Sequence, residues 1–172
     1  RAAGLETMNV LIACERSGRV RDAFARLGHD AWSCDLLETE IPGQHIKGNV
    51  LEILENGWDL AIFHPPCTYL CSSGLHWNKR RPERQILTDD AVEFARILLN
   101  APINKIALEN PIGCLSTRIR KPDQIIQPWQ FGHSESKATC LWLKNLPVLR
   151  PTNILTKTGK YWDNQTKSGQ NK

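Results

Sequence analysis

The stretch 58–67, WDLAIFHPPC, is an apolar run that ends in two prolines and a cysteine. Leu60 to Phe63 reads as a buried β-strand, and Pro65 and Pro66 must end it because proline cannot donate a hydrogen bond to a sheet. Cys67 is therefore expected just beyond the carboxyl end of a strand. In open α/β sheets, ligands bind and chemistry takes place at that edge.

Strands and helices alternate on both sides of this stretch. The pattern predicts strands at 9–14, 30–36, 58–64, 104–111 and 138–146, a short turn or helix at 48–54, and helices at 19–27 and 89–100. Asp89 and Asp90 are expected to begin the second helix, where the helix dipole favours acids. The alternation predicts an α/β fold, with a mostly parallel sheet and helices on both faces.

Length and composition indicate one globular domain. The chain has 172 residues, 41% of them hydrophobic and 23% charged, and its net charge of +4 allows nucleic acid as a partner without requiring it. No apolar run approaches the roughly 20 residues of a membrane span, and no secretory signal precedes the cysteines. We therefore expect a cytoplasmic protein with free thiols and no membrane partner.

The two ends of the chain are expected to lie outside the fold. We interpret residues 1–7 as an expression scar and residues 8–150 as the folded domain. Residues 151–172 carry four lysines and one aspartate with few apolar residues, which predicts a frayed tail or the beginning of a missing C-terminal segment.

Parallel strands end at one edge of a sheet, and four polar segments follow the predicted strands there: 14–18 (CERSG), Asp35, 64–67 (HPPC) and 109–111 (ENP). Gly18 and the amides that begin the next helix would let a nucleotide-like ligand approach, and Asp35 could bind ribose hydroxyls. A lone glycine after a strand is more often a plain turn.

Cys67 and Glu109 form the more informative pair. A thiolate is a strong carbon nucleophile, and a carboxylic acid facing it could protonate a ring nitrogen under attack. The alternatives are a buried structural thiol and an acid in an ion pair. The double proline before Cys67 argues against simple core packing, and an acid that closes an apolar strand costs desolvation unless it has a partner.

These residues resemble the signature elements of the cytosine-C5 DNA methyltransferases. PPC (65–67) is similar to the first catalytic motif, SSG (72–74) to the small residues that follow it, and ENP (109–111) to the second motif. The resemblance spans residues 8–150 and is closer to short phage-type methylase-like members. It implies a Rossmann-like fold dependent on S-adenosylmethionine and methyl transfer to C5 of a flipped cytosine in DNA.

The resemblance also implies residue roles. Cys67 would add to C6 of cytosine and Glu109 would hold N3, while Asn49 stands where the family usually has an aspartate for the adenine amino group. The implied cofactor-binding residues are Cys14, Glu15, Ser17, Gly18, Asp35, Asn49 and Pro65. The implied substrate-binding residues are Pro66, Ser73, Lys79, Arg80, Arg81, Asn110, Arg118 and Arg120. No resident metal is implied.

The segment 68–88 is polar and basic, and it is predicted to be a functional loop because it is too long for a plain connection. The family closes such a segment over an extruded base. Its basic residues at 79–84 would contact phosphates, and Trp77 would stack or wedge. The alternative is a solvated basic loop.

The chain departs from the family pattern in two places. Arg16 stands where a glycine is usual, so it would either obstruct the methionine pocket or pair with the methionine carboxylate. The separate recognition domain of sequence-reading members is missing, so recognition would come from a partner chain or a missing C-terminal segment. These departures leave open a DNA- or S-adenosylmethionine-binding protein without turnover.

Two further alternatives remain open. An amino-methyltransferase acting on adenine N6 or cytosine N4 would share the two prolines of HPPC, although it would not need Cys67. A zinc-binding module would use the ligand types at His64, Cys67, Cys71 and His76. The aromatic stretch 127–147 is interpreted as core and turn residues.

Overall fold

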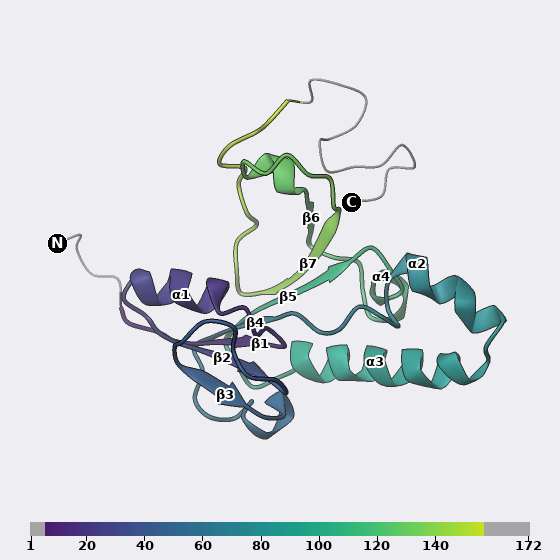
Figure 1. Cartoon of the computed structure of the whole chain (residues 1–172), viewed down its shortest axis with the longest axis horizontal. Coiled ribbons are helices and arrows are strands. Elements are labelled where there is room, and N and C mark those ends of the chain that lie inside the picture. Colours follow the sequence, from purple (N-terminus) through teal and green to yellow (C-terminus); the bar gives the residue numbers. More distant parts are fainter. Residues whose placement is uncertain (1–5, 157–172) are drawn as a thin grey trace.

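The computed structural model describes residues 6–156, which form one seven-stranded sheet in the order β3-β2-β1-β4-β5-β7-β6 (Figure 1). The strands are β1 (Asn9–Ala13), β2 (Asp30–Asp35), β3 (His45–Lys47), β4 (Leu60–Phe63), β5 (Lys105–Pro111), β6 (Gln124–Ile126) and β7 (Thr139–Lys144). Strands β1 to β5 are parallel, whereas β7 is antiparallel to both β5 and β6. The predicted α/β class with a mostly parallel sheet is confirmed.

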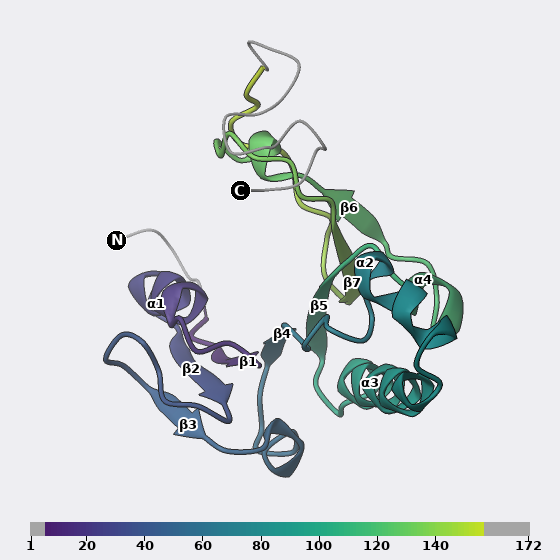
Figure 2. The same cartoon turned by 45° about the vertical axis from the view of Figure 1, so that its right-hand side comes forward.

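Helices lie on both faces of the sheet, as predicted (Figure 2). They are α1 (Arg19–Arg26), α2 (Ser72–Leu75), α3 (Glu83–Leu99) and α4 (Leu115–Arg118), with 3-10 turns η1 (Val50–Glu52), η2 (His76–Lys79) and η3 (Pro128–Gln130).

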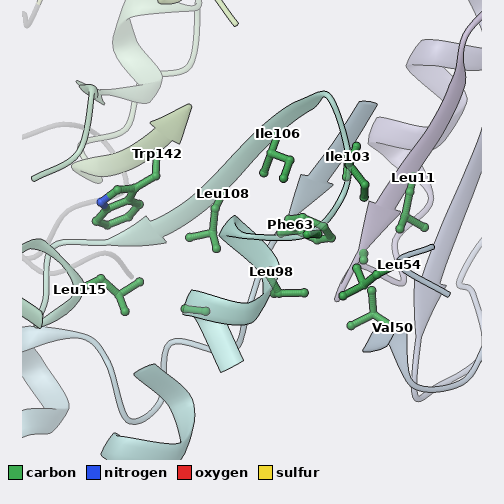
Figure 3. Packing of buried hydrophobic residues seen from close by; sticks show 14 of the residues in the cluster. Leu11, Val50, Leu54, Phe63, Leu98, Ile103, Ile106, Leu108, Leu115 and Trp142 are labelled. Atoms are coloured by element: carbon green, nitrogen blue, oxygen red, sulfur yellow. The ribbon is translucent and has the colours of Figure 1, made fainter. Parts of the chain in front are cut away.

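Side chains of β1 alternate between two apolar clusters because successive strand residues point to opposite faces. Val10 and Ile12 belong to the cluster on which Val20 and Phe24 of α1 pack. Leu11 lies in the larger cluster, together with Leu98 of α3, Phe63 of β4 and Leu108 of β5 (Figure 3). This two-sided burial determines the position of the sheet and thereby the positions of the strand ends.

A buried arginine joins α1 to the segment after β2. Arg21 is 1% exposed and donates to Asp22, to the hydroxyls of Ser33 and Thr39, and to the carbonyl oxygens of Ile41 and Pro42. A buried charge is tolerated only with such a full set of partners. Arg21 therefore holds residues 36–44 beside the sheet edge.

The predicted loop 68–88 is wrong in large part, since it contains α2, η2 and the first residues of α3. Helix α3 begins at Glu83, directly after Pro82, so Asp89 and Asp90 lie inside the helix and not at its start. The helical pattern is hidden there because Ile86 and Leu87 are exposed. The three-residue strands β3 and β6 were also not predicted, because so short a run carries no periodicity.

The segment between β6 and β7 and the described residues after β7 form an arm that projects away from the rest of the sheet (Figure 1). The backbone amides of Thr152 and Asn153 donate to the carbonyl oxygen of Gln130, and that of Leu155 donates to Trp129. Residues 151–156 are thus held against the arm, in contrast to the expected frayed tail. Residues 1–5 of the expected scar and residues 157–172 of the expected tail lie outside the described residues.

Candidate active site

Strands β4 and β5 bring two of the predicted elements together at their carboxyl ends. Phe63 pairs with Leu108 in the ladder, so the next residues along, His64 and Glu109, are neighbours. Nδ1 of His64 lies 3.1 Å from Oε2 of Glu109, and each side chain is 27% exposed. The acid that closes the apolar strand therefore has a partner, and that partner was not predicted from the sequence.

The turn that carries Cys67 is fixed from β5. Nδ2 of Asn110 donates to the carbonyl oxygen of Pro65 at 2.8 Å, and the amides of Leu70 and Cys71 donate to the carbonyl oxygen of Cys67 at 2.9 and 3.0 Å. Asn110 is 1% exposed and its Nδ2 is engaged by this bond, and its predicted contact with substrate stays a prediction. Its amide ties the Pro-Pro-Cys turn to the strand that carries Glu109.

The surroundings of Cys67 oppose formation of its thiolate. Burial raises the pKa of the Cys67 thiol above its usual value, and the neighbouring Cys71 and Glu109 raise it further. Lys137 acts in the opposite direction. Lys137 lies two residues before β7, which runs antiparallel to β5 and pairs Thr139 with Pro111. No local pattern in the sequence pointed to Lys137, because its position depends on this antiparallel return.

A pocket of about 580 Å³ opens beside this turn, at the ends of β1 and β2. Its lining residues are Cys14, Cys34, Asp35, Leu36, Gly48, Asn49, Val50, Leu51, Pro66, Tyr69, Asp90, Ala91 and Phe94. The volume lies within the range of small-molecule sites, which is roughly 300–1,000 Å³. Of the predicted cofactor residues, the lining includes Cys14, Asp35 and Asn49.

Two polar side chains of the pocket are partly engaged by their own turns. Oδ1 of Asp35 accepts from the amide of Leu37 at 3.0 Å, which leaves its second oxygen for a ligand hydroxyl. Oδ1 of Asn49 accepts from the amide of Leu51 at 3.1 Å and caps η1. A carbonyl oxygen has two lone pairs, so Asn49 can accept one further hydrogen bond.

The remaining walls suit an uncharged ring system. Desolvation by burial raises the pKa of Cys14 to about 12 and that of Cys34 to about 11, and the charge of Asp35 adds to both shifts. Both thiols are therefore neutral and act as apolar lining at neutral pH. Together with Leu36 and Leu51 they form an apolar wall, whereas Asp35, Asn49 and Asp90 are polar residues of the lining.

The segment 15–18 contributes less to the pocket than predicted, because Glu15, Ser17 and Gly18 do not line it. The carboxylate of Glu15 accepts from the Ser17 hydroxyl and from the Gly18 amide. At Gly18 φ is 72°, and a Cβ there would lie 2.5 Å from the guanidinium of Arg21. Glycine is thus required here for packing against Arg21, whereas the sequence alone related it to ligand approach.

Two further expectations about the pocket change. Nε of Arg16 pairs with Glu40 at 3.1 Å. Arg16 does not line the pocket, where it was expected either to obstruct the methionine group or to pair with its carboxylate. Pro66 lines the pocket and Pro65 does not. The sequence had related Pro65 to the cofactor and Pro66 to the substrate.

Basic side chains gather on η2 and the start of α3. The guanidinium carbons of Arg80 and Arg81 lie 5.4 and 6.0 Å from the ring centre of Trp77, and that of Arg84 lies 4.7 Å from the ring of Tyr69. Trp77, Arg81 and Arg84 line a small hollow of about 210 Å³. We call residues 77–84 the basic turn.

Three other predicted substrate residues have local partners. The hydroxyl of Ser73 lies 3.2 Å from Sγ of Cys71. Arg118 pairs with Asp89 at 2.8 Å and Arg120 pairs with Asp123 at 2.8 Å. Both arginines are therefore neutralised locally, unlike the basic turn.

The predicted zinc ligands do not assemble in the structure. Within residues 6–156 no group of three or more His, Cys, Asp or Glu side chains is placed to hold a metal ion. All six cysteines are free. The same part of the chain contains no helix long and apolar enough to cross a membrane.

Comparison with known proteins finds similarity only at the level of structure. No protein-family profile and no curated protein sequence matches the chain. It is similar to a protein described as a DNA modification methyltransferase encoded within a prophage of E. coli, with 16% identity and a TM-score of 0.50, over 80% of this chain and 46% of that one. It also resembles the bifunctional kinase-methyltransferase WbdD, with 15% identity and a TM-score of 0.48, over 95% of this chain and 40% of that one.

The chain spans less than half the length of either protein. At such identities a structural likeness is informative about the fold alone. Together with the seven-stranded sheet, the first likeness shows that the chain has an α/β, Rossmann-like methyltransferase fold.

Proposed function

We propose that the chain is a DNA cytosine-5 methyltransferase that works through a covalent adduct at Cys67. The observation that carries this proposal is the convergence of Cys67 and Glu109 at the ends of neighbouring parallel strands. A pocket with an acidic end at Asp35 opens on the same side, and Pro66 lines it directly before Cys67. The proposed nucleophile, the proposed acid and the proposed cofactor pocket would thus act at one sheet edge.

Asp35 would hold the ribose hydroxyls of S-adenosylmethionine in the pocket, and the bound cofactor would supply the methyl group. The thiolate of Cys67 adds to C6 of the base, and Glu109 donates to N3, which makes C5 nucleophilic. Because burial raises the pKa of Cys67, its proton must be removed when the base is bound. Loss of the C5 proton then allows the thiolate to leave.

The basic turn is proposed to hold DNA phosphates. Lys79, Arg80 and Arg81 are exposed, and residues 77–84 form the connection between the turn that carries Cys67 and the long part of α3 that lines the pocket. Exposed cations at such a place neutralise phosphates and release counterions. Target recognition would then come from a partner chain or from a further segment beyond the residues described.

The test is methyl transfer from labelled S-adenosylmethionine to unmodified DNA, followed by digestion and detection of 5-methylcytosine. Wild-type protein and the Cys114→Ser variant should both give labelled 5-methylcytosine, whereas Cys67→Ser should give none. Cys114 is a matched control because it is also a half-buried free thiol. Label in adenine or at cytosine N4 would contradict the proposal in favour of an amino-methyltransferase.

A binding protein without turnover is the second candidate. Two observations favour it: the Glu15 carboxylate already occupies the Gly18 amide at the start of α1, and the pKa of Cys67 is raised. Folded wild-type protein that binds S-adenosylmethionine or DNA but transfers no label would support this candidate over the enzyme.

A further inference from the structure

His64 makes one specific side-chain contact, and that contact is to the proposed acid. Its Nδ1 lies 3.1 Å from Oε2 of Glu109, and its backbone amide donates to the carbonyl oxygen of Ala13 at 3.0 Å, which continues the pairing of β1 with β4. His64 is thereby held on both sides by the sheet. Its ring and the Glu109 carboxyl face each other because β4 and β5 are parallel and in register.

The free ring nitrogen indicates which tautomer is present. Nε2 of His64 is buried and has no hydrogen-bond partner among the described residues. When Glu109 is a carboxylate it can only accept, so in that state Nδ1 carries the proton that joins His64 to Glu109. A second proton at Nε2 would bury a charged N–H without an acceptor, which is costly. The arrangement therefore favours a neutral imidazole with its single proton on Nδ1.

We infer that His64 is a positioning residue that determines which oxygen of Glu109 carries the catalytic proton. The Nδ1–H bond occupies Oε2, so a proton that binds Glu109 goes to Oε1, the oxygen left free to face a base. This inference rests on the proposed function and adds to it a residue outside the Cys67 and Glu109 pair.

The proton and electron balance of the step is simple. Sγ of the Cys67 thiolate bonds to C6, the C5=C6 electron pair forms C4=C5, and the C4=N3 pair takes the Oε1 proton at N3. Glu109 is left as a carboxylate, and the Nδ1–H of His64 stabilises that charge through a charge-assisted hydrogen bond. No proton leaves His64 during the step.

Other titratable groups surround the pair. The charge of Glu109 acts on the thiols of Cys67 and Cys140, and Lys137 acts on Cys67. Both thiols have raised pKa values, with desolvation by burial as the largest cause. Cys67 and Cys140 are therefore neutral in the free protein at neutral pH. The hydrogen-bond partner of Glu109 is His64.

Two substitutions separate the orienting bond from mere packing. His64→Asn keeps an N–H donor close to the position of Nδ1, whereas His64→Leu keeps bulk and removes the donor. With DNA and labelled S-adenosylmethionine, His64→Leu should lower kcat about 10- to 100-fold, the usual scale for a residue that orients a reacting group. KM should be unchanged, and His64→Asn should stay within about threefold of wild type.

Thermal unfolding of each variant establishes that it is folded. Equal kcat values for folded His64→Leu and wild type would overturn the inference.

A second measurement does not need activity. The ¹⁵N chemical shifts of the His64 ring should place its proton on Nδ1 in wild type and on Nε2 in the Glu109→Ala variant. A wild-type ring with its proton on Nε2 would overturn the inference even if the protein methylates DNA. If wild type transfers no methyl group, the proposed function and the catalytic role of the pair fail together, and the ring shifts still decide whether His64 orients Glu109.

Discussion

Cys67 lies between groups that oppose its ionisation and one cation that favours it. Burial, Cys71 and Glu109 all raise the pKa of its thiol, whereas a backbone hydrogen bond and the charge of Lys137 lower it. At any pH below that pKa, the thiolate fraction therefore depends in part on Lys137. An enzyme that uses this thiol gains from keeping a cation at this place.

Replacing Lys137 with methionine should slow alkylation of Cys67 by iodoacetamide. Loss of the positive charge raises the pKa of the thiol still further, so at pH 8 and low ionic strength we expect a decrease of roughly threefold. Mass spectrometry of the peptide that contains Cys67 measures the rate. Lys137→Arg should preserve it, and an unchanged rate in Lys137→Met would show that Lys137 does not act on the thiol.

Asn110 is expected to contribute to stability. Asn110→Ala leaves the buried carbonyl oxygen of Pro65 without its donor, which should cost about 1–3 kcal/mol of unfolding free energy. Urea unfolding measures this loss. The exposed Asn56→Ala is the control and should change stability by less than about 0.5 kcal/mol. A loss in Asn110→Ala no larger than that of the control would contradict the assignment.

Some of these residues could be predicted from the sequence and others could not, for a physical reason. Cys67, Asp35 and Glu109 follow apolar runs, so their place at strand ends could be recognised from local pattern. The hydrogen bonds of Asn110 with Pro65 and of His64 with Glu109 depend on the register between β4 and β5. Register is set by packing across the whole sheet, and a single strand does not reveal it.

Among the elements, α3 differs most from the sequence prediction. The apolar residues from Ala91 to Leu99 predicted its second half correctly, while Asp89 and Asp90 suggested a false start. In the structure Asp89 pairs with Arg118, and the buried Thr88 donates to the carbonyl oxygen of Tyr69 at 3.1 Å. The contact of Thr88 with Tyr69 lies in the first half of α3. This part of the helix is held by a polar residue and therefore has no apolar pattern in the sequence.

The basic turn before α3 should account for a large part of the DNA affinity. Replacing Lys79, Arg80 and Arg81 together with alanine should weaken binding and reduce the slope of log K against log salt by about 0.9 for each phosphate that is no longer neutralised. Fluorescence anisotropy at several salt concentrations measures both quantities. Arg19→Ala with Arg26→Ala removes exposed charges from α1, on the opposite face of the sheet, and should leave the slope unchanged. A triple variant with the wild-type slope would exclude the basic turn as a phosphate site.

For the molecule as a whole, the class of fold could be predicted from the sequence but the strand order could not. Alternating strands and helices required a largely parallel sheet, because a parallel return needs a crossover. Nothing in the residues of β7 distinguishes a parallel from an antiparallel strand, since both are buried apolar runs. Because β7 runs antiparallel to β5, Lys137 lies near Cys67. The direction of β7 could not be predicted, so the projecting arm that contains Lys137 could not be predicted either.

The thiols of Cys14 and Cys34, at the ends of β1 and β2, should make the folded protein less stable at alkaline pH. The pKa of Cys14 is about 12 and that of Cys34 about 11 in the folded protein, against about 8.5 in an unfolded chain. The folded state therefore holds these protons more tightly. Stability is fully present below about pH 8.5 and is lost as pH rises toward the folded values, at up to about 1.4 kcal/mol per pH unit for each thiol.

Chemical unfolding at pH 8 and pH 10 tests this dependence. The Cys14→Ala, Cys34→Ala double variant should lose less stability between the two pH values than wild type does, although it is less stable at pH 8 because its core is less well packed. An equal loss in both proteins would show that other groups govern the alkaline limit.

A trapped adduct tests most directly whether Cys67 forms a bond to cytosine. DNA that contains 5-fluorocytosine cannot lose a proton from C5, so after methyl transfer the thiol cannot leave. In the presence of S-adenosylmethionine we predict a denaturant-resistant complex of protein and DNA, with the DNA attached to the peptide that contains Cys67 and no complex in Cys67→Ser. Methyl transfer to ordinary DNA without any such complex, or a complex attached at another cysteine, would contradict this mechanism.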